Sequence, residues 1–258
     1  MKIVDSHAHL YFEHFKADRA EVLAAARAAG VAAFVNVGTD AETTRLTFEL
    51  AAAEPDVFPT AGIHPNDAHV VDADEWAVVE RYARDPRCVA IGETGLDWFR
   101  NRDQREAQIA AFERQIGWAR ELGLPVIIHC REAFDDVFAT FERVGRGVPG
   151  VMHCFSGGPA EAERAVGLGL HVSFAAPITY RKNDALREAA KRVPRERVLT
   201  ETDCPFLPPE SRRGKGNEPA YLAETVAALA RALDLRPDEV ATLAARNAVA
   251  LFRLPVAI

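Results

Sequence analysis

The sequence predicts an α/β protein of the (β/α)8 TIM-barrel class, in which eight parallel strands alternate with helices. Three observations lead to this prediction. The chain has 258 residues, and such barrels typically have roughly 250 residues. Short apolar runs alternate with helical segments from one end to the other. No Gly-rich dinucleotide fingerprint favours an open doubly wound sheet instead. We expect one domain over residues 1–258.

The expected strands are short and apolar, as in a parallel sheet that is covered on both faces. They cover residues 2–4, 33–37, 57–63, 88–92, 125–128, 150–152, 171–174 and 197–200. Helices are expected between the strands, at residues 18–29, 39–53, 74–84, 103–122, 132–144, 159–167 and 183–192. Two further helices, at 218–233 and 237–252, end the chain.

Three of the expected helix ends have recognisable capping residues. Asp18 with Glu21, and Thr39 with Glu42, have the spacing of a capping box, in which two side chains satisfy free backbone amides at the helix start. Gly30 suits the position just after the first helix, where a left-handed backbone is common.

The composition indicates an ordinary globular protein, with 48% hydrophobic and 27% charged residues. No apolar run approaches the roughly 18 residues of a membrane span, and the N-terminus does not resemble a secretion signal. We therefore expect a cytoplasmic protein with no membrane association and no obligate protein partner. The net charge of −7 argues against broad attraction to nucleic acid, although basic residues cluster locally in 181–197 and 212–215.

Histidines and carboxylates stand where the expected strands end. His7 and His9 follow the first strand, and side chains two apart in an extended strand point in the same direction. Other potential ligands follow later strands. They are His64, Glu93, His129, His153 and Asp203. Because the C-terminal ends of barrel strands meet at one mouth, we expect these side chains to converge on a metal site there.

This set of ligands exceeds the three that a catalytic zinc ion usually takes from a protein, so a pair of ions fits better. Glu93, on a central strand, is the natural carboxylate to bridge them. The expected ligands of one ion are His7, His9 and Asp203, and those of the other are His129 and His153. Mixed imidazole and carboxylate ligands suit Zn²⁺, Mn²⁺, Fe²⁺ or Co²⁺, and suit Mg²⁺ less well.

Seven short motifs resemble, in the same order, the signature blocks of the TatD-family metal-dependent hydrolases. They are Asp5-Ser6-His7-Ala8-His9-Leu10, Gly62-Ile63-His64-Pro65, Gly92-Glu93-Thr94-Gly95-Leu96-Asp97, His129-Cys130-Arg131, His153-Cys154-Phe155-Ser156-Gly157, Glu201-Thr202-Asp203-Cys204-Pro205 and Arg213-Gly214-Lys215-Gly216-Asn217-Glu218-Pro219. The resemblance implies a barrel of the metal-dependent amidohydrolase type, a two-metal centre and phosphodiester cleavage, commonly as a 3′-to-5′ deoxyribonuclease. By matching position it also implies a ligand set, namely His7, His9, Glu93, His129, His153 and Asp203. Thr94 and Trp98 depart from the residues more usual in the family.

In such a centre, Asp203 and Glu93 are the expected catalytic residues. Asp203 would accept a proton from the attacking water and return it to the leaving oxygen, while Glu93 bridges the ions. Arg131 follows His129 by two residues on the same face, where it can bind a phosphate or pair with a ligand carboxylate. His64 can likewise contact a phosphate or hold a carboxylate of the centre.

A basic loop at residues 212–218 is expected to hold the substrate over the mouth, because its two glycines allow close backbone approach. The expected contacts are Arg213, Lys215, Asn217 and Glu218. Four aromatic residues just past strand ends can either stack a terminal base or belong to the core. They are Trp98, Phe99, Phe155 and Phe206.

The expected substrates are DNA ends or short oligonucleotides. A second interpretation keeps the centre but changes the substrate to an ester, lactone or amide. Many barrels of the amidohydrolase type bridge their ions with a carboxylated lysine, and no lysine ends an expected strand here. A third interpretation is a metal-stabilised binding or scaffold protein, which would not need surplus ligands at an open mouth.

Overall fold

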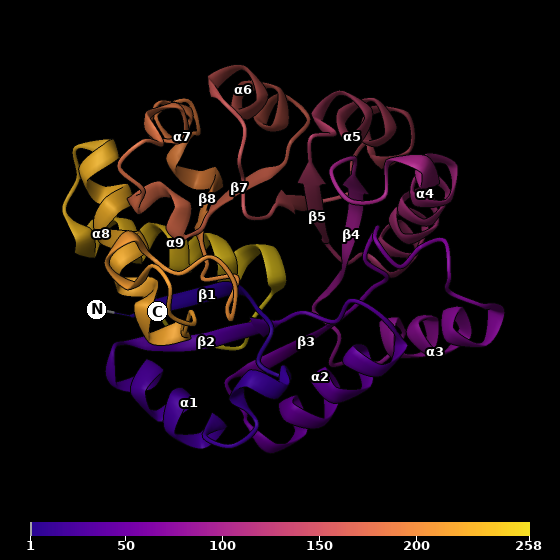
Figure 1. Cartoon of the computed structure of the whole chain (residues 1–258), viewed down its shortest axis with the longest axis horizontal. Coiled ribbons are helices and arrows are strands. Elements are labelled where there is room, and N and C mark those ends of the chain that lie inside the picture. The colour runs from indigo at the N-terminus through magenta and orange to yellow at the C-terminus, as the bar shows by residue number, and fades with distance from the viewer. Residues whose placement is uncertain (1) are drawn as a thin grey trace.

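The computed structural model describes residues 2–258, and its eight parallel strands are paired in chain order, from β1 to β8 (Figure 1). The strands are β1 Ile3–Ala8, β2 Val31–Asn36, β3 Val57–Ala61, β4 Ala90–Asp97, β5 Val126–Arg131, β6 Gly150–Met152, β7 His171–Phe174 and β8 Val198–Thr200. This arrangement confirms the predicted (β/α)8 barrel.

Helices alternate with the strands and surround the sheet (Figure 1). They are α1 Arg19–Ala28, α2 Ala41–Ala53, α3 Ala73–Ala83, α4 Arg105–Leu122, α5 Phe134–Thr140, α6 Pro159–Gly167, α7 Asp184–Ala190, α8 Leu222–Leu233 and α9 Pro237–Phe252. None of these helices is long and apolar enough to cross a membrane.

The last and first strands meet through hydrogen bonds just beyond β8. The backbone amide of Asp203 donates to the carbonyl oxygen of His7 over 3.0 Å, and the amide of His9 donates to the carbonyl oxygen of Cys204 over 2.9 Å. These bonds close the ring of strands. They also place Asp203 beside His7 and His9, although almost 200 residues of sequence separate Asp203 from the two histidines.

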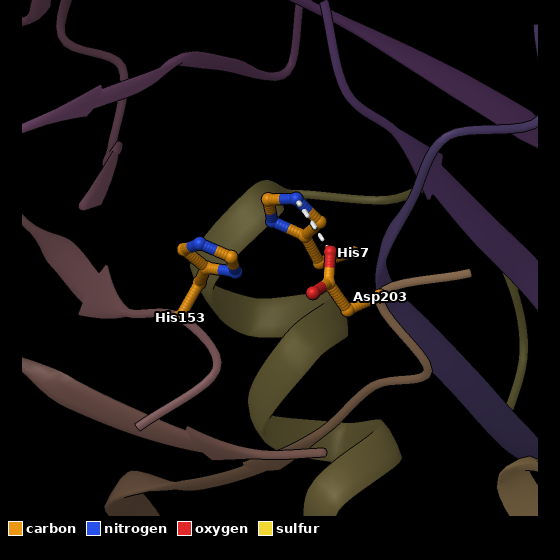
Figure 2. A group of neighbouring side chains, drawn as sticks. All are labelled: His7, His153 and Asp203. Carbon is orange, nitrogen blue, oxygen red and sulfur yellow. Dashed lines mark ion pairs between the residues drawn. The ribbon is translucent and has the colours of Figure 1, made fainter. Parts of the chain in front are cut away.

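The C-terminal helix α9 closes the barrel beneath the mouth. Inward-facing Val4 of β1 and Leu199 of β8 belong to one buried cluster with Ala248 and Phe252 of α9. In Figure 2, a helix in the yellow of the C-terminus lies behind the side chains of the mouth. The two ends of the chain therefore contribute to the same core.

Strands β4 and β5 are longer than predicted, and Glu93 lies within β4 rather than at its end. The pairing shifts register between Ile91 and Thr94 and then continues as far as Asp97. Gly95 permits this extension: its φ is +135°, and a Cβ atom there would lie 2.0 Å from the carbonyl oxygen of His129. The glycine allows close strand contact and does not mark a strand end.

The predicted capping boxes are wrong. Asp18 makes no capping hydrogen bond, because its backbone, with ψ of 17°, is not in the extended conformation of an N-cap residue. At α2 the N-cap is Asp40, whose carboxylate accepts from the Thr43 amide over 2.7 Å, so the box begins one residue later than predicted. Gly30, with φ of +99°, confirms the expected end of α1.

His171, at the start of β7, should make stability pH-dependent. Burial, together with the nearby charge of Arg197, lowers the pKa of His171 to about 4 from its ordinary 6.5. The unfolded chain therefore binds this proton more readily, and the contribution of His171, complete above pH 6.5, is lost as pH falls towards 4. Because the side chain is only partly buried, we expect an effect of about 1–2 kcal/mol after solvent screening.

Urea unfolding at pH 7.5 and 5.0 checks this expectation. The His171→Gln variant should lose about 1–2 kcal/mol less stability between the two pH values than the wild type does. The exposed His69 provides the control, since His69→Gln should leave the wild-type pH dependence in place. Equal losses in wild type and His171→Gln would contradict the assignment.

Candidate metal centre

The structure brings all the predicted metal ligands, and His64, into one cluster at the barrel mouth. They are His7 and His9 from β1 and its end, His64 beyond β3, Glu93 from β4, His129 from β5, His153 beyond β6 and Asp203 beyond β8. Figure 2 shows three of them, with the rings of His7 and His153 stacked at a centroid distance of 3.9 Å and the Asp203 carboxylate turned toward His7.

Glu93, which is only 3% exposed, lies between two groups of imidazoles. Its Oε2 atom is 3.4 Å from Nε2 of His7 and 3.6 Å from Nε2 of His9. Its Oε1 atom is 2.9 Å from both Nδ1 of His129 and Nε2 of His153. The two oxygens of one buried carboxylate thus face different pairs of histidines.

The first group has the spacing of ligands around one ion. Nε2 of His7 is 3.1 Å from Nε2 of His9, and Oδ1 of Asp203 is 3.8 and 3.5 Å from these two nitrogens. Atoms bound to one ion at roughly 2.0–2.1 Å lie about 3–3.5 Å apart in tetrahedral geometry. These residues, with Oε2 of Glu93, can therefore hold a divalent cation with little rearrangement.

Neighbouring groups orient two of the imidazoles. Nδ1 of His9 lies 3.0 Å from the carbonyl oxygen of Val37, to which it can donate, so that Nε2 is left as the metal-binding atom. Nε2 of His129 lies 3.1 Å from Oδ2 of Asp97, which leaves Nδ1 facing Glu93. A carboxylate or carbonyl partner that selects the tautomer in this way is typical of metal-binding histidines.

Asp97 and Glu201, which are not among the predicted site residues, support the cluster. Asp97 contacts His129. Oε1 of Glu201 lies 3.4 Å from Nδ1 of His153 and accepts a hydrogen bond from the backbone amide of Cys154. Both residues stand within motifs that also contain a predicted ligand. Their position close to a predicted ligand in the sequence was the signal that could have identified them.

The cluster keeps its carboxylates ionised. Burial would raise the pKa of Glu93, but the surrounding imidazoles, led by His153 and His64, hold it well below its usual value. Burial acts in the same direction on Asp203, yet its contact with His9 and the nearby His7 and His153 lower its pKa. Both groups are anionic at neutral pH, as metal ligation requires.

The cluster forms the floor of an open cavity of about 620 Å³, within the range of small-molecule and cofactor sites. Arg131 lines it, with its guanidinium stacked 3.8 Å over the ring of Phe99. Within residues 2–258 Arg131 forms no ion pair with a ligand carboxylate, and its contact with a phosphate stays a prediction. His64 lies 3.4 Å from Oε1 of Glu93 and also lines the cavity.

The structure does not bring the four predicted residues of the basic loop into the cavity. Arg213 stacks over Tyr180, and Lys215 is exposed. Asn217 is buried and donates to backbone carbonyl oxygens of the preceding loop, while Glu218 accepts from the Tyr221 hydroxyl. Their contacts with substrate stay predictions.

Imidazoles and carboxylates gathered at the strand-end mouth of a (β/α)8 barrel define a metal-dependent hydrolase. Comparison with known proteins gives the family: residues 4–253 match the family described as TatD related DNase, and the chain belongs to it. The resemblance noted in the sequence motifs is thereby confirmed.

Individual relatives match over almost the whole chain. An uncharacterized metal-dependent hydrolase, YabD, of Bacillus subtilis is 35% identical, and the match covers 98% of this chain and 99% of YabD. The 3′-5′ ssDNA/RNA exonuclease TatD of Erwinia amylovora is 38% identical over 97% of this chain and 99% of that protein. The crystal structure of the Escherichia coli TatD homologue YjjV has a TM-score of 0.92 at 30% identity and covers 98% of both chains.

Proposed function

We propose that this protein is a two-metal phosphodiesterase that removes nucleotides from the 3′ ends of single-stranded nucleic acid, with DNA ends or short oligonucleotides as substrates. The observation that carries the proposal is the position of Glu93, whose two oxygens face separate pairs of histidines. The printed name of the Erwinia amylovora relative supports the choice of substrate and direction. Residues 1–258 would act as one domain.

Each of the two groups of side chains would hold one divalent ion, and Glu93 would bridge the ions. The first set is His7, His9 and Asp203, and the second is His129 and His153. Zn²⁺, Mn²⁺, Fe²⁺ and Co²⁺ suit these ligands better than Mg²⁺ does. When bound, such ions lower the pKa of water and neutralise charge that develops on the phosphoryl oxygens.

Asp203 is placed to move the proton during hydrolysis. Asp203 lines the cavity and is 8% exposed, and its carboxylate is ionised at neutral pH because its pKa is lowered. It would accept a proton as the water oxygen attacks phosphorus, and return it to the oxygen that leaves as the phosphodiester bond breaks. This exchange leaves the carboxylate ready for the next cycle.

Arg131 and His64 would serve binding and support. The Arg131 guanidinium is oriented by the Phe99 ring and makes no ion pair within residues 2–258, so its donors can bind a phosphate of the substrate. His64 contacts Oε1 of Glu93 and would hold that carboxylate in its bridging position.

Digestion of a labelled oligonucleotide tests the proposal. A 5′-labelled single-stranded DNA is incubated with chelated protein that is re-supplied with Mg²⁺, Mn²⁺, Co²⁺ or Zn²⁺, and an RNA of the same sequence is run in parallel. We expect a ladder that shortens from the 3′ end only when metal is present. Folded, metal-loaded protein that cleaves neither strand would contradict the proposal, and esters, lactones and amides would then be the substrates to test.

A further inference from the structure

One wall of the cavity is apolar and leads outward from the metal centre. Phe206 and Leu207 line this wall and are 45% and 40% exposed. The Phe206 ring meets the edge of the Phe12 ring at a centroid distance of 5.2 Å, and both rings lie 5.9 Å from the ring of His9. An aromatic surface therefore begins beside a predicted metal ligand and continues into the open cavity.

The exposed position of Phe206 is held by the backbone. Its amide donates to the carbonyl oxygen of Asp203 over 2.9 Å, and its own carbonyl oxygen accepts from Nδ2 of Asn217 over 2.7 Å. Asn217 is buried and bonds the carbonyl oxygen of Thr202 as well. Its side chain thus tethers both ends of the segment that carries Phe206, and the ring is presented to the cavity from a braced loop.

None of the other aromatic candidates offers a free ring inside the cavity. Phe155 is 3% exposed and Trp98 is 6% exposed, so both belong to the core, and the indole of Trp98 donates to Asp136 over 2.9 Å. Phe99 is exposed, but the Arg131 guanidinium covers a face of its ring. Of the four aromatic residues that follow strand ends, Phe206 is the one available for stacking inside the cavity.

Two guanidinium groups line the wall across the cavity. Arg100 lines it from the loop after β4 and Arg131 from the end of β5, and these strands lie across the ring from β1 and β8 (Figure 1). A nucleotide combines a flat apolar base with an anionic phosphate, so it matches a cavity that has an aromatic surface on one side and guanidinium groups on the other. Base stacking on aromatic side chains is tolerant of sequence because every base has a π face.

We propose that Phe206, supported by Phe12, stacks the unpaired base of the 3′-terminal nucleotide. This inference rests on the proposed function, because it assumes that the terminal phosphodiester lies at the Glu93 cluster. A base that is paired in a duplex cannot reach Phe206. The subsite would therefore recognise a free, unpaired strand end. The base subsite is therefore defined by Phe12, Phe206 and Leu207.

Binding of two matched oligonucleotides tests the base subsite without requiring turnover. One is a short fluorescent single strand with a normal 3′-terminal nucleotide, the other has an abasic tetrahydrofuran there, and both have a terminal phosphorothioate that resists cleavage. We expect wild-type protein to bind the normal strand about 5- to 150-fold more tightly. Phe206→Leu should remove most of this preference, and Phe206→Trp, which keeps an aromatic face, should retain it.

Val70, which is 65% exposed and does not line the cavity, gives the matched control Val70→Ala. Thermal unfolding and metal content show whether each variant keeps the fold and the centre. Equal binding of the two strands by wild type, or an undiminished preference in Phe206→Leu, would overturn the base subsite. A preference that depends on Phe206, in a protein that cleaves no strand with any ion, would uphold the subsite and refute the exonuclease proposal.

Discussion

A Glu93→Gln variant is expected to bind fewer than one divalent ion per chain and to lose at least about 10³-fold in kcat/KM. The buried carboxylate lies within 3.6 Å of five imidazoles, and its lowered pKa keeps it anionic. Glutamine keeps the shape but removes the charge that offsets two cations and the second oxygen that faces the other pair of histidines. Metal analysis after gel filtration and initial rates on an oligonucleotide measure both effects.

The surface residue Glu142 supplies a control of the same chemistry, since Glu142→Gln should keep the metal content and the rate of wild type. Circular dichroism establishes that Glu93→Gln remains folded. Two ions per chain together with wild-type turnover in Glu93→Gln would exclude a bridging role for this residue.

The convergence of the ligands was predictable because barrel geometry brings strand ends together regardless of their distance in sequence. His7 and Asp203 meet for this reason. Helix starts were also predictable where proline occupies the first turn: α6 begins at Pro159 and α9 at Pro237, as predicted. Proline fixes the backbone there and has no amide hydrogen that needs a partner. The start of such a helix can therefore be predicted from the proline itself, without knowledge of tertiary contacts.

The supporting residues could not be assigned from sequence, because they depend on strand register. Asp97 reaches His129 only because β4 continues beyond a register shift, and the glycines that allow this resemble a strand end in the sequence. The role of Asn217 could not be predicted from the sequence for a different reason. A polar side chain in a loop can face a ligand or satisfy its own backbone, and in this structure Asn217 bonds carbonyl oxygens of the loop.

The aromatic residues show the same limit of sequence patterns. Phe155 and Phe206 both follow strand ends and both border the cavity, yet Phe155 is 3% exposed while Phe206 is 45% exposed. The difference arises from the loop that carries Phe206, which is tethered by Asn217, 11 residues further along the chain. Position after a strand therefore selects candidates, and burial distinguishes the core residue from the one that can meet a ligand.

An Asp203→Asn variant is expected to retain the fold and most of its metal, while kcat falls about 10²- to 10⁴-fold. Asp203 has a left-handed backbone with φ of +58°, a conformation that asparagine adopts more readily than most residues. The amide oxygen can still point toward His7 and His9, but it cannot accept a proton at neutral pH. The loss should therefore appear in kcat more than in KM, as measured by steady-state kinetics with parallel metal analysis.

Asp67, a second carboxylate that lines the cavity, supplies the control, because Asp67→Asn should stay within about 3-fold of the wild-type kcat if only Asp203 transfers the proton. Restoration of Asp203→Asn to wild-type turnover by excess metal would show that Asp203 acts only as a ligand, and would remove it from proton transfer.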